Sequence, residues 1–175
     1  MELMSLVGPE EIEKVVDRLA SEIRNDYRGR VPVMVCVLKG AFVFTADLVR
    51  RLDIPVEIDF IRASSYGAAC ESSGQVTISR GLELDVSGRD VIVVEDILDT
   101  GLTLDAVMGH IRGLSPATVK VCTLLDKPAR RAVECRADYA GMEIEDMFVV
   151  GYGLDCAERH RNLSGLYVMK MPSEG

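Results

Sequence analysis

Residues 91–104, VIVVEDILDTGLTL, constrain the fold of this chain more than any other stretch. The four β-branched residues 91–94 follow the turn-prone sequence SGRD, and a short apolar run of this kind is typical of a strand buried on both faces, as in a parallel sheet. Glu95 and Asp96 come at the carboxyl end of that run, and the apolar spacing from Leu104 onward predicts a helix. Strand, acidic pair, small-residue loop and helix in this order predict a site for a phosphorylated polyol.

The loop between this strand and this helix, residues 99–103, has the chemistry of an anion site. Gly101 lets the backbone turn tightly and approach a ligand, while Thr100 and Thr103 add hydroxyl donors. The first N–H groups of the helix would point at the same place, and each hydrogen bond to a charged oxygen contributes roughly 1.5–3 kcal/mol. The neighbouring carboxylates suit vicinal hydroxyls, or Mg²⁺ held through water. The alternative is a solvated strand end before an ordinary helix cap.

A second strand–loop–helix unit precedes this one. Apolar residues at helical spacing across residues 8–29 predict a helix, and the apolar run at 32–38 predicts another buried strand. Lys39 and Gly40 follow that strand, and residues 41–52 predict the next helix. The unit repeats the anion-site pattern, although a surface lysine that opens a helix explains Lys39 equally well.

The rest of the chain is rich in strand signals. Residues 55–61 alternate apolar and polar, which predicts a half-exposed strand, and strand character resumes at 75–79. Between them, residues 64–74 are small and polar, as in a long hairpin tip. Two further β-rich runs, at 117–125 and 147–150, predict core strands.

Two of these strands carry residues with more than one interpretation. Lys127 stands at the tip of a strand that Pro128 ends, and a lysine there is usually solvated. Phe148 lies in an apolar strand, where an aromatic residue is most often part of the core. Gly151 and Gly153 do not form a dinucleotide fingerprint, because no third glycine and no βαβ spacing follow them.

Length and charge narrow the functional classes. A chain of 175 residues suits one domain and buries about 70% of the surface that its unfolded form exposes. The net charge of −8 argues against non-specific binding to nucleic acid, which needs a basic face. Because the expected ligand is also anionic, a divalent metal and a few placed cations must offset the repulsion.

The cysteines and the absence of targeting signals bear on location. The five cysteines are odd in number and include no CxxC pair, and Cys36 and Cys122 lie in apolar runs that predict buried thiols. The sequence shows neither a signal peptide nor an apolar span of about 18 residues. We therefore expect no membrane association and a reducing cytoplasm.

The run VVEDILDTGLT resembles the phosphoribosyl pyrophosphate (PRPP) motif of type I phosphoribosyltransferases, and residues 5–170 resemble the hypoxanthine or hypoxanthine-guanine phosphoribosyltransferases. The resemblance implies an α/β fold with a parallel sheet flanked by helices, a small hood and a flexible lid hairpin. It implies one domain over 1–175, with the core at about 8–135, the hood from the N- and C-terminal segments and the lid at about 64–78.

The same resemblance implies an enzyme of purine salvage that uses Mg²⁺. It would transfer the 5-phosphoribosyl group of PRPP to N9 of hypoxanthine and/or guanine, giving IMP or GMP and pyrophosphate. Asp99 would act as acid/base at N7 of the purine, and the Leu–Lys peptide of the pyrophosphate loop is often cis in the family. The resemblance assigns PRPP and its phosphate to Glu95, Asp96, Asp99, Thr100, Gly101, Leu102 and Thr103; pyrophosphate to Leu38, Lys39, Gly40 and Arg161; the purine to Lys127, Phe148, Val149 and Asp155; the metal to Glu95, Asp96 and Asp155; and the lid to Ser64, Ser65, Tyr66 and Gly67.

Two positions depart from the family pattern. Cys156 stands where tyrosine is common, and Glu145 where proline is common. Neither position carries a proposed catalytic group, so the departures bear on the geometry of the base site and not on the reaction. An acceptor other than hypoxanthine or guanine, such as xanthine, adenine or a pyrimidine, is the second enzymatic interpretation. Lys127 together with Phe148 favours an oxopurine.

A third interpretation is a PRPP-sensing regulator that binds RNA or DNA, which the net charge of −8 disfavours. We also expect a homodimer or homotetramer. A helix face around Ala41, Phe42 and Phe44 suggests a dimer contact, although a core role explains these residues equally well.

Overall fold

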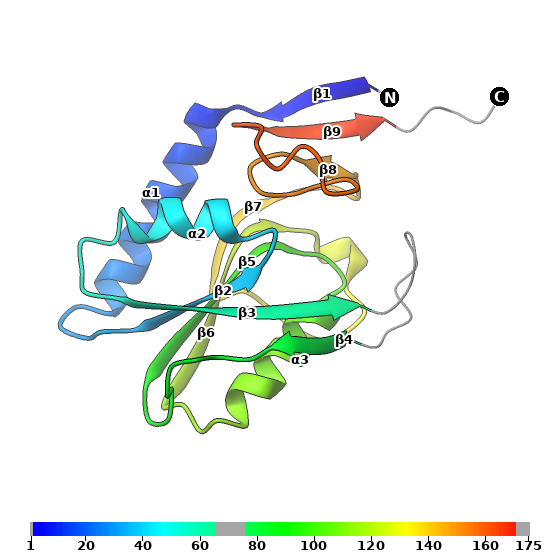
Figure 1. Ribbon diagram of the computed structural model, residues 1–175. Coiled ribbons are helices and arrows are strands. Elements are labelled where there is room, and N and C mark those ends of the chain that lie inside the picture. The colour runs from blue at the N-terminus through cyan, green and yellow to red at the C-terminus, as the bar shows by residue number, and fades with distance from the viewer. Residues whose placement is uncertain (1, 66–75, 171–175) are drawn as a thin grey trace.

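The structure, a computed structural model, describes residues 2–65 and 76–170 (Figure 1). These residues form two β-sheets and the helices that pack on the larger one. In chain order the elements are β1 (Glu2–Val7), α1 (Pro9–Asp26), β2 (Val33–Leu38), α2 (Phe42–Val49), β3 (Glu57–Ser65), β4 (Val76–Arg80), β5 (Asp90–Leu98), α3 (Leu102–Arg112), β6 (Thr118–Asp126), the 3₁₀ helix η1 (Pro128–Arg130), β7 (Tyr139–Glu143), β8 (Val149–Val150) and β9 (Leu166–Lys170).

The larger sheet has the strand order β4-β3-β2-β5-β6-β7. All neighbours in it are parallel except the antiparallel pair β3 and β4, which confirms the expected mostly parallel α/β sheet. Residues 91–94 of β5 are fully buried between β2 and β6, as their apolar run predicted. The strand continues to Leu98, which pairs with Asp126. Glu95 and Asp96, which the sequence placed at the carboxyl end of the strand, therefore lie inside β5, before its last residue.

Helices cover both faces of this sheet. In Figure 1, α1 and α2 lie on one side and α3 on the other. Successive strand residues point to opposite faces. Ile92 and Val94 accordingly belong to the core under α1 and α2, whereas Val91 and Val93 belong to the core under α3. No helix among the described residues is both long and apolar enough to cross a membrane.

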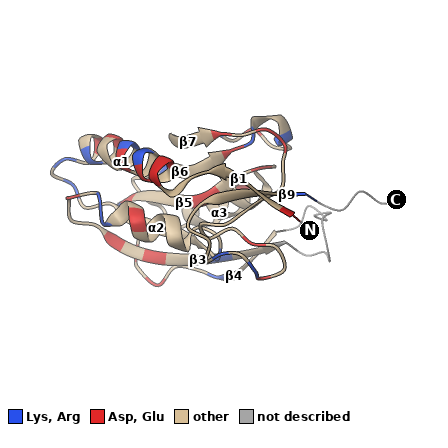
Figure 2. Cartoon of the chain, turned by 90° about the horizontal axis from the view of Figure 1, so that it is seen from above, with Lys and Arg blue, Asp and Glu red and all other residues tan. Residues whose placement is uncertain are grey.

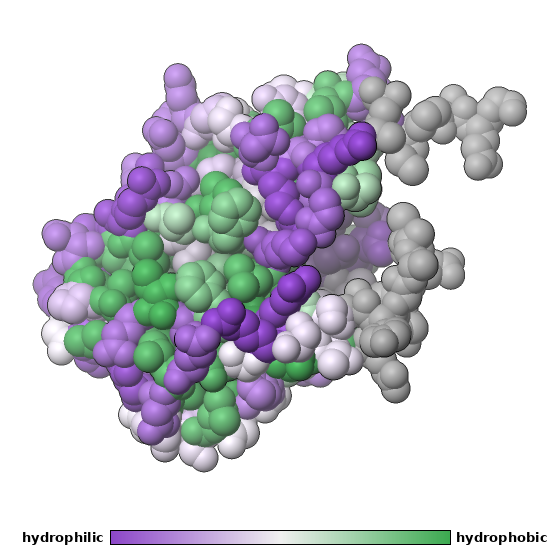
Figure 3. Space-filling model, in the orientation of Figure 1, coloured by the Kyte–Doolittle hydropathy of each residue, from purple (hydrophilic) through white to green (hydrophobic). Residues whose placement is uncertain are grey.

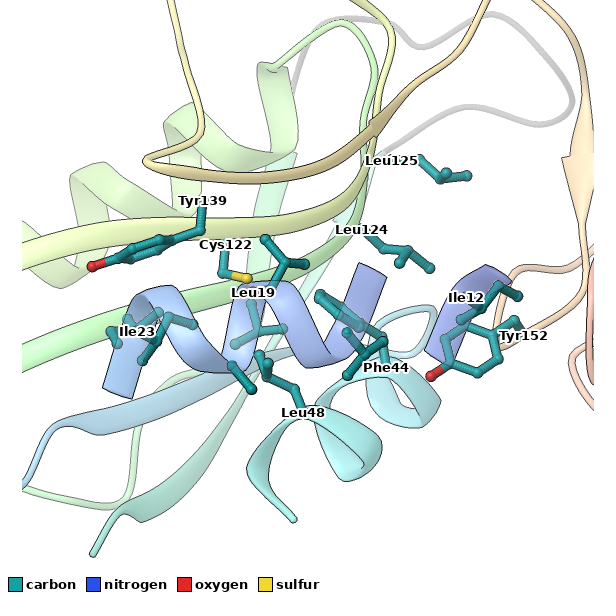
Figure 4. Close-up of a cluster of buried hydrophobic side chains, with 14 of the residues drawn as sticks. Ile12, Leu19, Ile23, Phe44, Leu48, Cys122, Leu124, Leu125, Tyr139 and Tyr152 are labelled. Carbon is teal, nitrogen blue, oxygen red and sulfur yellow. The ribbon is translucent and has the colours of Figure 1, made fainter. Parts of the chain in front are cut away.

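The core under α1 and α2 is built from several elements. Figure 4 shows Leu19 and Ile23 of α1 close to Leu48 of α2 and Cys122 of β6, all buried. The opposite side of α1 is exposed and carries both signs of charge along its length (Figure 2). This amphipathic division explains why the apolar spacing of α1 was visible in the sequence.

The smaller sheet joins the two ends of the chain. It has the order β1-β9-β8, and β1 pairs with β9 in antiparallel register from Glu2 with Lys170 onward. Its strands β1 and β9 come from the terminal segments that the expected hood would comprise. The strand predicted at 147–150 is reduced to β8 and belongs to this sheet. β7 extends the larger sheet to Glu143, beyond the core boundary expected near residue 135.

Candidate active site

Three loops meet at the carboxyl edge of the larger sheet. β2, β5 and β6 are adjacent and parallel, so the segments after Leu38, Leu98 and Asp126 emerge on the same side. Ligands of open α/β sheets bind outside the carboxyl ends of the strands. The topology thus brings together the loops that carry Lys39, residues 99–103 and Lys127.

The acidic pair lies at the centre of this edge. Glu95 is buried, and its Oε2 has no hydrogen-bond partner among the described residues. Burial, reinforced by the charge of Asp96, raises the pKa of Glu95 well above its ordinary value. Burial likewise raises the pKa of Asp96, whose Oδ1 accepts the N–H of Ile97 at 2.9 Å. Two such carboxyls side by side suit a cation or hydroxyl donors, which would offset their desolvation and repulsion.

The Lys39 loop approaches the acidic pair very closely. A Cβ on Gly40 would lie 1.8 Å from Oδ2 of Asp96, so any larger residue would have to displace the Asp96 carboxylate. The Leu38–Lys39 peptide is cis. The Lys39 loop therefore lies against the acidic pair of β5.

The 99–103 loop has the shape of an anion cup. Gly101 adopts φ +85° and caps α3, which begins at Leu102, two residues earlier than predicted. The N–H groups of Thr100, Gly101 and Thr103 donate to no other described residue, whereas the N–H of Leu102 lies 3.4 Å from Oγ1 of Thr100. Unpaired amides at the N-terminus of a helix are donors for a phosphate.

Asp99 is paired with a residue that sequence reasoning had not assigned to the site. Nε of Arg130 lies 3.1 Å from Oδ1 of Asp99, an ion pair without an aligned hydrogen bond. Nη1 of Arg130 also donates to Asp146 at 3.3 Å. Nothing in the spacing of Asp99, Arg130 and Asp146 along the chain indicates these contacts. The loop after β5, η1 and the turn before β8 come together only in the folded protein.

Lys39 and Arg161 share a second unpredicted carboxylate. Nζ of Lys39 lies 2.8 Å from Oε1 of Glu158, and Nη2 of Arg161 lies 3.4 Å from its Oε2. Arg161 also pairs with Asp155 at 2.9 Å, and Asp155 accepts the N–H of Glu158 at 2.8 Å. The two cations assigned to pyrophosphate, Lys39 and Arg161, are thus close together, and each forms an ion pair with a carboxylate of the same chain.

The residues assigned to the purine differ from their simplest interpretations. Lys127 is buried with 6% of its area exposed, so it is not a solvated lysine, and its Nζ lies 4.0 Å from Oδ1 of Asp146. Phe148 is 47% exposed, so it is not a core aromatic. Val149 is buried in β8 and pairs with Val168. A half-exposed ring beside a buried backbone suits stacking on a flat ligand.

The lid residues are only partly covered by the structure. Ser64 lies exposed near the end of β3. Ser65 belongs to the same strand, but its side chain, together with Tyr66 and Gly67, lies outside the described residues.

Fold and loops define the class of this protein as an α/β phosphoribosyltransferase, and comparison with known proteins agrees. The family model described as a phosphoribosyl transferase domain matches residues 7–157. The chain is 46% identical over 165 residues to the hypoxanthine-guanine phosphoribosyltransferase of Bacillus subtilis, covering 94% of this chain and 92% of that one. It is 42% identical over 172 residues to the hypoxanthine phosphoribosyltransferase of Haemophilus influenzae, covering 97% and 95%.

A solved structure extends this similarity to three dimensions. The crystal structure of a hypoxanthine-guanine phosphoribosyltransferase from Bacillus anthracis matches with a TM-score of 0.92 at 45% identity, covering 97% of this chain and 100% of that chain. The chain belongs to the hypoxanthine-guanine phosphoribosyltransferase family.

Proposed function

We propose that this chain transfers the 5-phosphoribosyl group of PRPP to N9 of a 6-oxopurine, hypoxanthine or guanine, and releases pyrophosphate. The observation that carries the proposal is that Oε2 of buried Glu95 and the N–H groups of Thr100, Gly101 and Thr103 have no hydrogen-bond partner among the described residues. Such an oxygen and such amides are complementary to a sugar with a terminal phosphate.

Catalysis in this proposal consists mainly of positioning and charge stabilisation. Glu95 and Asp96 accept hydrogen bonds from the ribose hydroxyls and place negative charge near the sugar carbon as it becomes cationic. The amides of the 99–103 loop hold the 5′-phosphate. Lys39 and Arg161 exchange their internal carboxylates for the pyrophosphate that leaves.

Asp99 is the proposed acid/base. As N9 of the purine attacks the sugar carbon and pyrophosphate departs, the ring must lose a proton, and a carboxylate at N7 would accept it. Nε of Arg130 lies 3.1 Å from Oδ1 of Asp99, and this ion pair holds the carboxylate in one place before the substrate arrives.

Mg²⁺ fits the donor set of the site. The described residues contain no group of three carboxylate, histidine or cysteine side chains that could hold a metal alone. Mg²⁺ is normally held by one or two carboxylates together with substrate phosphates and water, and Glu95, Asp96 and Asp155 could serve in this way. Bound Mg²⁺ would neutralise charge on the pyrophosphate group.

The base specificity follows from Lys127 and Phe148. A buried ammonium donates to an oxygen at C6, whereas the amino group of adenine offers it no acceptor. Phe148 would stack on the ring, and the backbone of Val149 would pair with its edge. Competition among hypoxanthine, guanine, xanthine, adenine and uracil tests this assignment, and preferential use of adenine or uracil would overturn it.

The decisive test of the reaction is formation of IMP and GMP by the purified protein. We expect both products to require PRPP and Mg²⁺, and a chelator to abolish them. If neither product forms under these conditions while the protein is folded, the proposed activity is wrong. Asp155→Ala tests whether Asp155 helps to hold the metal. If it does, the variant should need a higher Mg²⁺ concentration for half-maximal rate.

An exposed apolar surface supports a homodimer or homotetramer. Phe42, Ile58 and Phe60 are 45%, 41% and 39% exposed, and Figure 3 shows apolar residues gathered over α2 and β3. Large exposed apolar patches mark interaction sites. Ala41 and Phe44 are buried, so of the face considered in the sequence only Phe42 can contribute. Light scattering of the wild type and of Phe60→Ser would test the assembly.

We further propose that residues 64–78 close over the reacting groups and that the protein works in the cytoplasm. A lid would exclude water, which could otherwise attack the activated sugar carbon. Protection of the 64–78 segment from proteolysis by PRPP, Mg²⁺ and an inert purine analogue would support closure. Cleavage at an unchanged rate would contradict it.

A further inference from the structure

The segment that follows η1 contacts the phosphate loop through its carbonyl groups. Nη1 of Arg131 donates to the carbonyl oxygen of Leu98 at 2.7 Å and to that of Asp99 at 2.5 Å. The N–H of Ala132 donates to the carbonyl oxygen of Thr100 at 2.9 Å. Three successive carbonyls at the start of the loop are therefore bonded to two neighbouring residues.

Peptide geometry makes these bonds relevant to the anion cup. In a trans peptide the C=O and the following N–H point to opposite sides. Because the carbonyls of residues 98–100 point at Arg131 and Ala132, the N–H groups of residues 99–101 must point away from them. None of these three N–H groups donates to another described residue. The arginine thus lies on one side of the loop and the free donors lie on the other.

The guanidinium is itself fixed from several directions. Nη2 pairs with the carboxylate of Asp126, and Nε donates to the carbonyl oxygen of Cys135 at 3.3 Å. The Arg131 side chain is only 18% exposed. A planar group held at both ends is a rigid template, which a freely rotating surface side chain is not.

We infer that Arg131 is a positioning residue for phosphate binding. It acts through the peptide groups that join residues 98, 99 and 100, which it holds so that their N–H groups face the phosphate. Hydrogen bonds to the carbonyls also polarise these peptides and strengthen their N–H groups as donors. The inference rests on the proposed role of the loop as the 5′-phosphate site.

Lysine cannot take over this role. An ammonium offers three donors at a single point, whereas the five N–H groups of a guanidinium spread over a plane can reach two carbonyls, a carboxylate and a third carbonyl together. Arg131→Lys keeps the charge beside Asp126 and removes the fork. The matched control is Arg136→Lys, because Arg136 is exposed and makes no hydrogen bond or ion pair with the described residues.

The test compares the binding of IMP with that of inosine, which lacks the 5′-phosphate, by calorimetry. We expect Arg131→Lys to lower the ratio of the two affinities about tenfold, since one hydrogen bond to a charged oxygen is worth at least that factor. Inosine affinity should change little, and Arg136→Lys should match the wild type in both affinities. Loop amides that no longer face the phosphate should weaken the binding of IMP and leave that of inosine unchanged, because inosine has no phosphate.

An unchanged ratio in Arg131→Lys would overturn the inference. An equal loss of IMP and inosine binding would also overturn it, because it would mean general damage. A wild type that binds IMP no better than inosine would refute the phosphate site itself, a failure visible before any substitution. If Arg131→Lys does not fold, Asp126→Asn removes the carboxylate that orients the guanidinium. It should lower the ratio about threefold, and an unchanged ratio would count against the inference.

Discussion

Replacing Gly101 by alanine tests the geometry on which the phosphate site depends. Gly101 has φ +85°, and a left-handed conformation costs a residue with a Cβ about 1–2 kcal/mol. The new Cβ would also lie 2.3 Å from Sγ of Cys135, so the thiol must move to another rotamer, at about 0.5–1.5 kcal/mol. Together these effects should reduce the free energy of unfolding by about 1.5–3.5 kcal/mol.

A double-mutant cycle separates the two contributions. Urea unfolding would be measured for the wild type, Gly101→Ala, Cys135→Ala and the double variant. Removing the thiol should recover about 0.5–1.5 kcal/mol of the cost of Gly101→Ala and leave the backbone term of about 1–2 kcal/mol. The KM for PRPP should rise in both variants that carry alanine at 101, because the loop amides shift. Strict additivity would refute the contact with Cys135, and an undiminished stability of Gly101→Ala would refute the strained backbone.

The remaining predictions concern charges. Asp99→Asn should lower kcat about 10²–10⁴-fold with little change in the KM for PRPP, because only proton transfer is lost; steady-state kinetics with wild-type turnover would remove Asp99 from the mechanism. Glu158→Gln should lower the KM for PRPP, because Lys39, 2.8 Å from Glu158, would no longer be held by an internal carboxylate. The melting temperature should stay constant, since Glu158 is exposed, and a raised KM would contradict this explanation. Lys127→Gln should lower kcat/KM for hypoxanthine and guanine about 10- to 100-fold by weakening the bond to O6, and an equal loss with adenine would argue against that contact. Burial raises the pKa of Glu95, so the folded protein binds a proton more tightly than the unfolded chain, and the free energy of unfolding should fall as the pH rises through the raised value. Glu95→Gln should flatten this dependence in melting curves recorded from about pH 4 to about pH 8, and identical pH profiles for the two proteins would show that Glu95 is not its source.

The central strand and its loop were predictable because their signals are local. The composition of residues 91–94 alone predicts a buried strand, and the loop after them combines glycine with hydroxyl residues. The strand continues a few residues beyond the apolar run for a non-local reason. β5 continues to Leu98 because Ile97 and Leu98 find partners in Leu125 and Asp126 of β6, and the partner strand is not visible in the sequence of β5.

The smaller sheet and the last strand of the larger one were not predictable in the same way. β1 becomes a strand by pairing with β9, so its first residue meets Lys170 at the other end of the chain. β7 contains Gly141, whose missing Cβ would lie 2.3 Å from the carbonyl oxygen of Leu124, and the need for a glycine there arises only from β6. The contacts of Glu158 with Lys39 and of Arg130 with Asp99 were not predictable either, because each joins segments that are distant in the chain.

The features of this site that reduce the stability of the folded protein are the ones that suit it to its proposed ligands. A buried carboxylate oxygen such as Oε2 of Glu95, which has no hydrogen-bond partner in the part of the chain that the structure describes, costs folding free energy. It is tolerated here because the surrounding parallel strands are held by two cores. The N–H groups of Gly101 and Thr103, at the start of α3, have no acceptor among residues 2–65 and 76–170. Lys39 and Arg161 are paired with Glu158, an exposed carboxylate that a pyrophosphate can displace. Each of these groups calls for a different partner. Glu95 is an acceptor for hydroxyls or metal, the amides are donors for one phosphate, and Lys39 and Arg161 are cations for a pyrophosphate. A ligand that satisfied only one of these groups would leave the others uncompensated, so the arrangement discriminates for molecules that carry a polyol between a phosphate and a pyrophosphate.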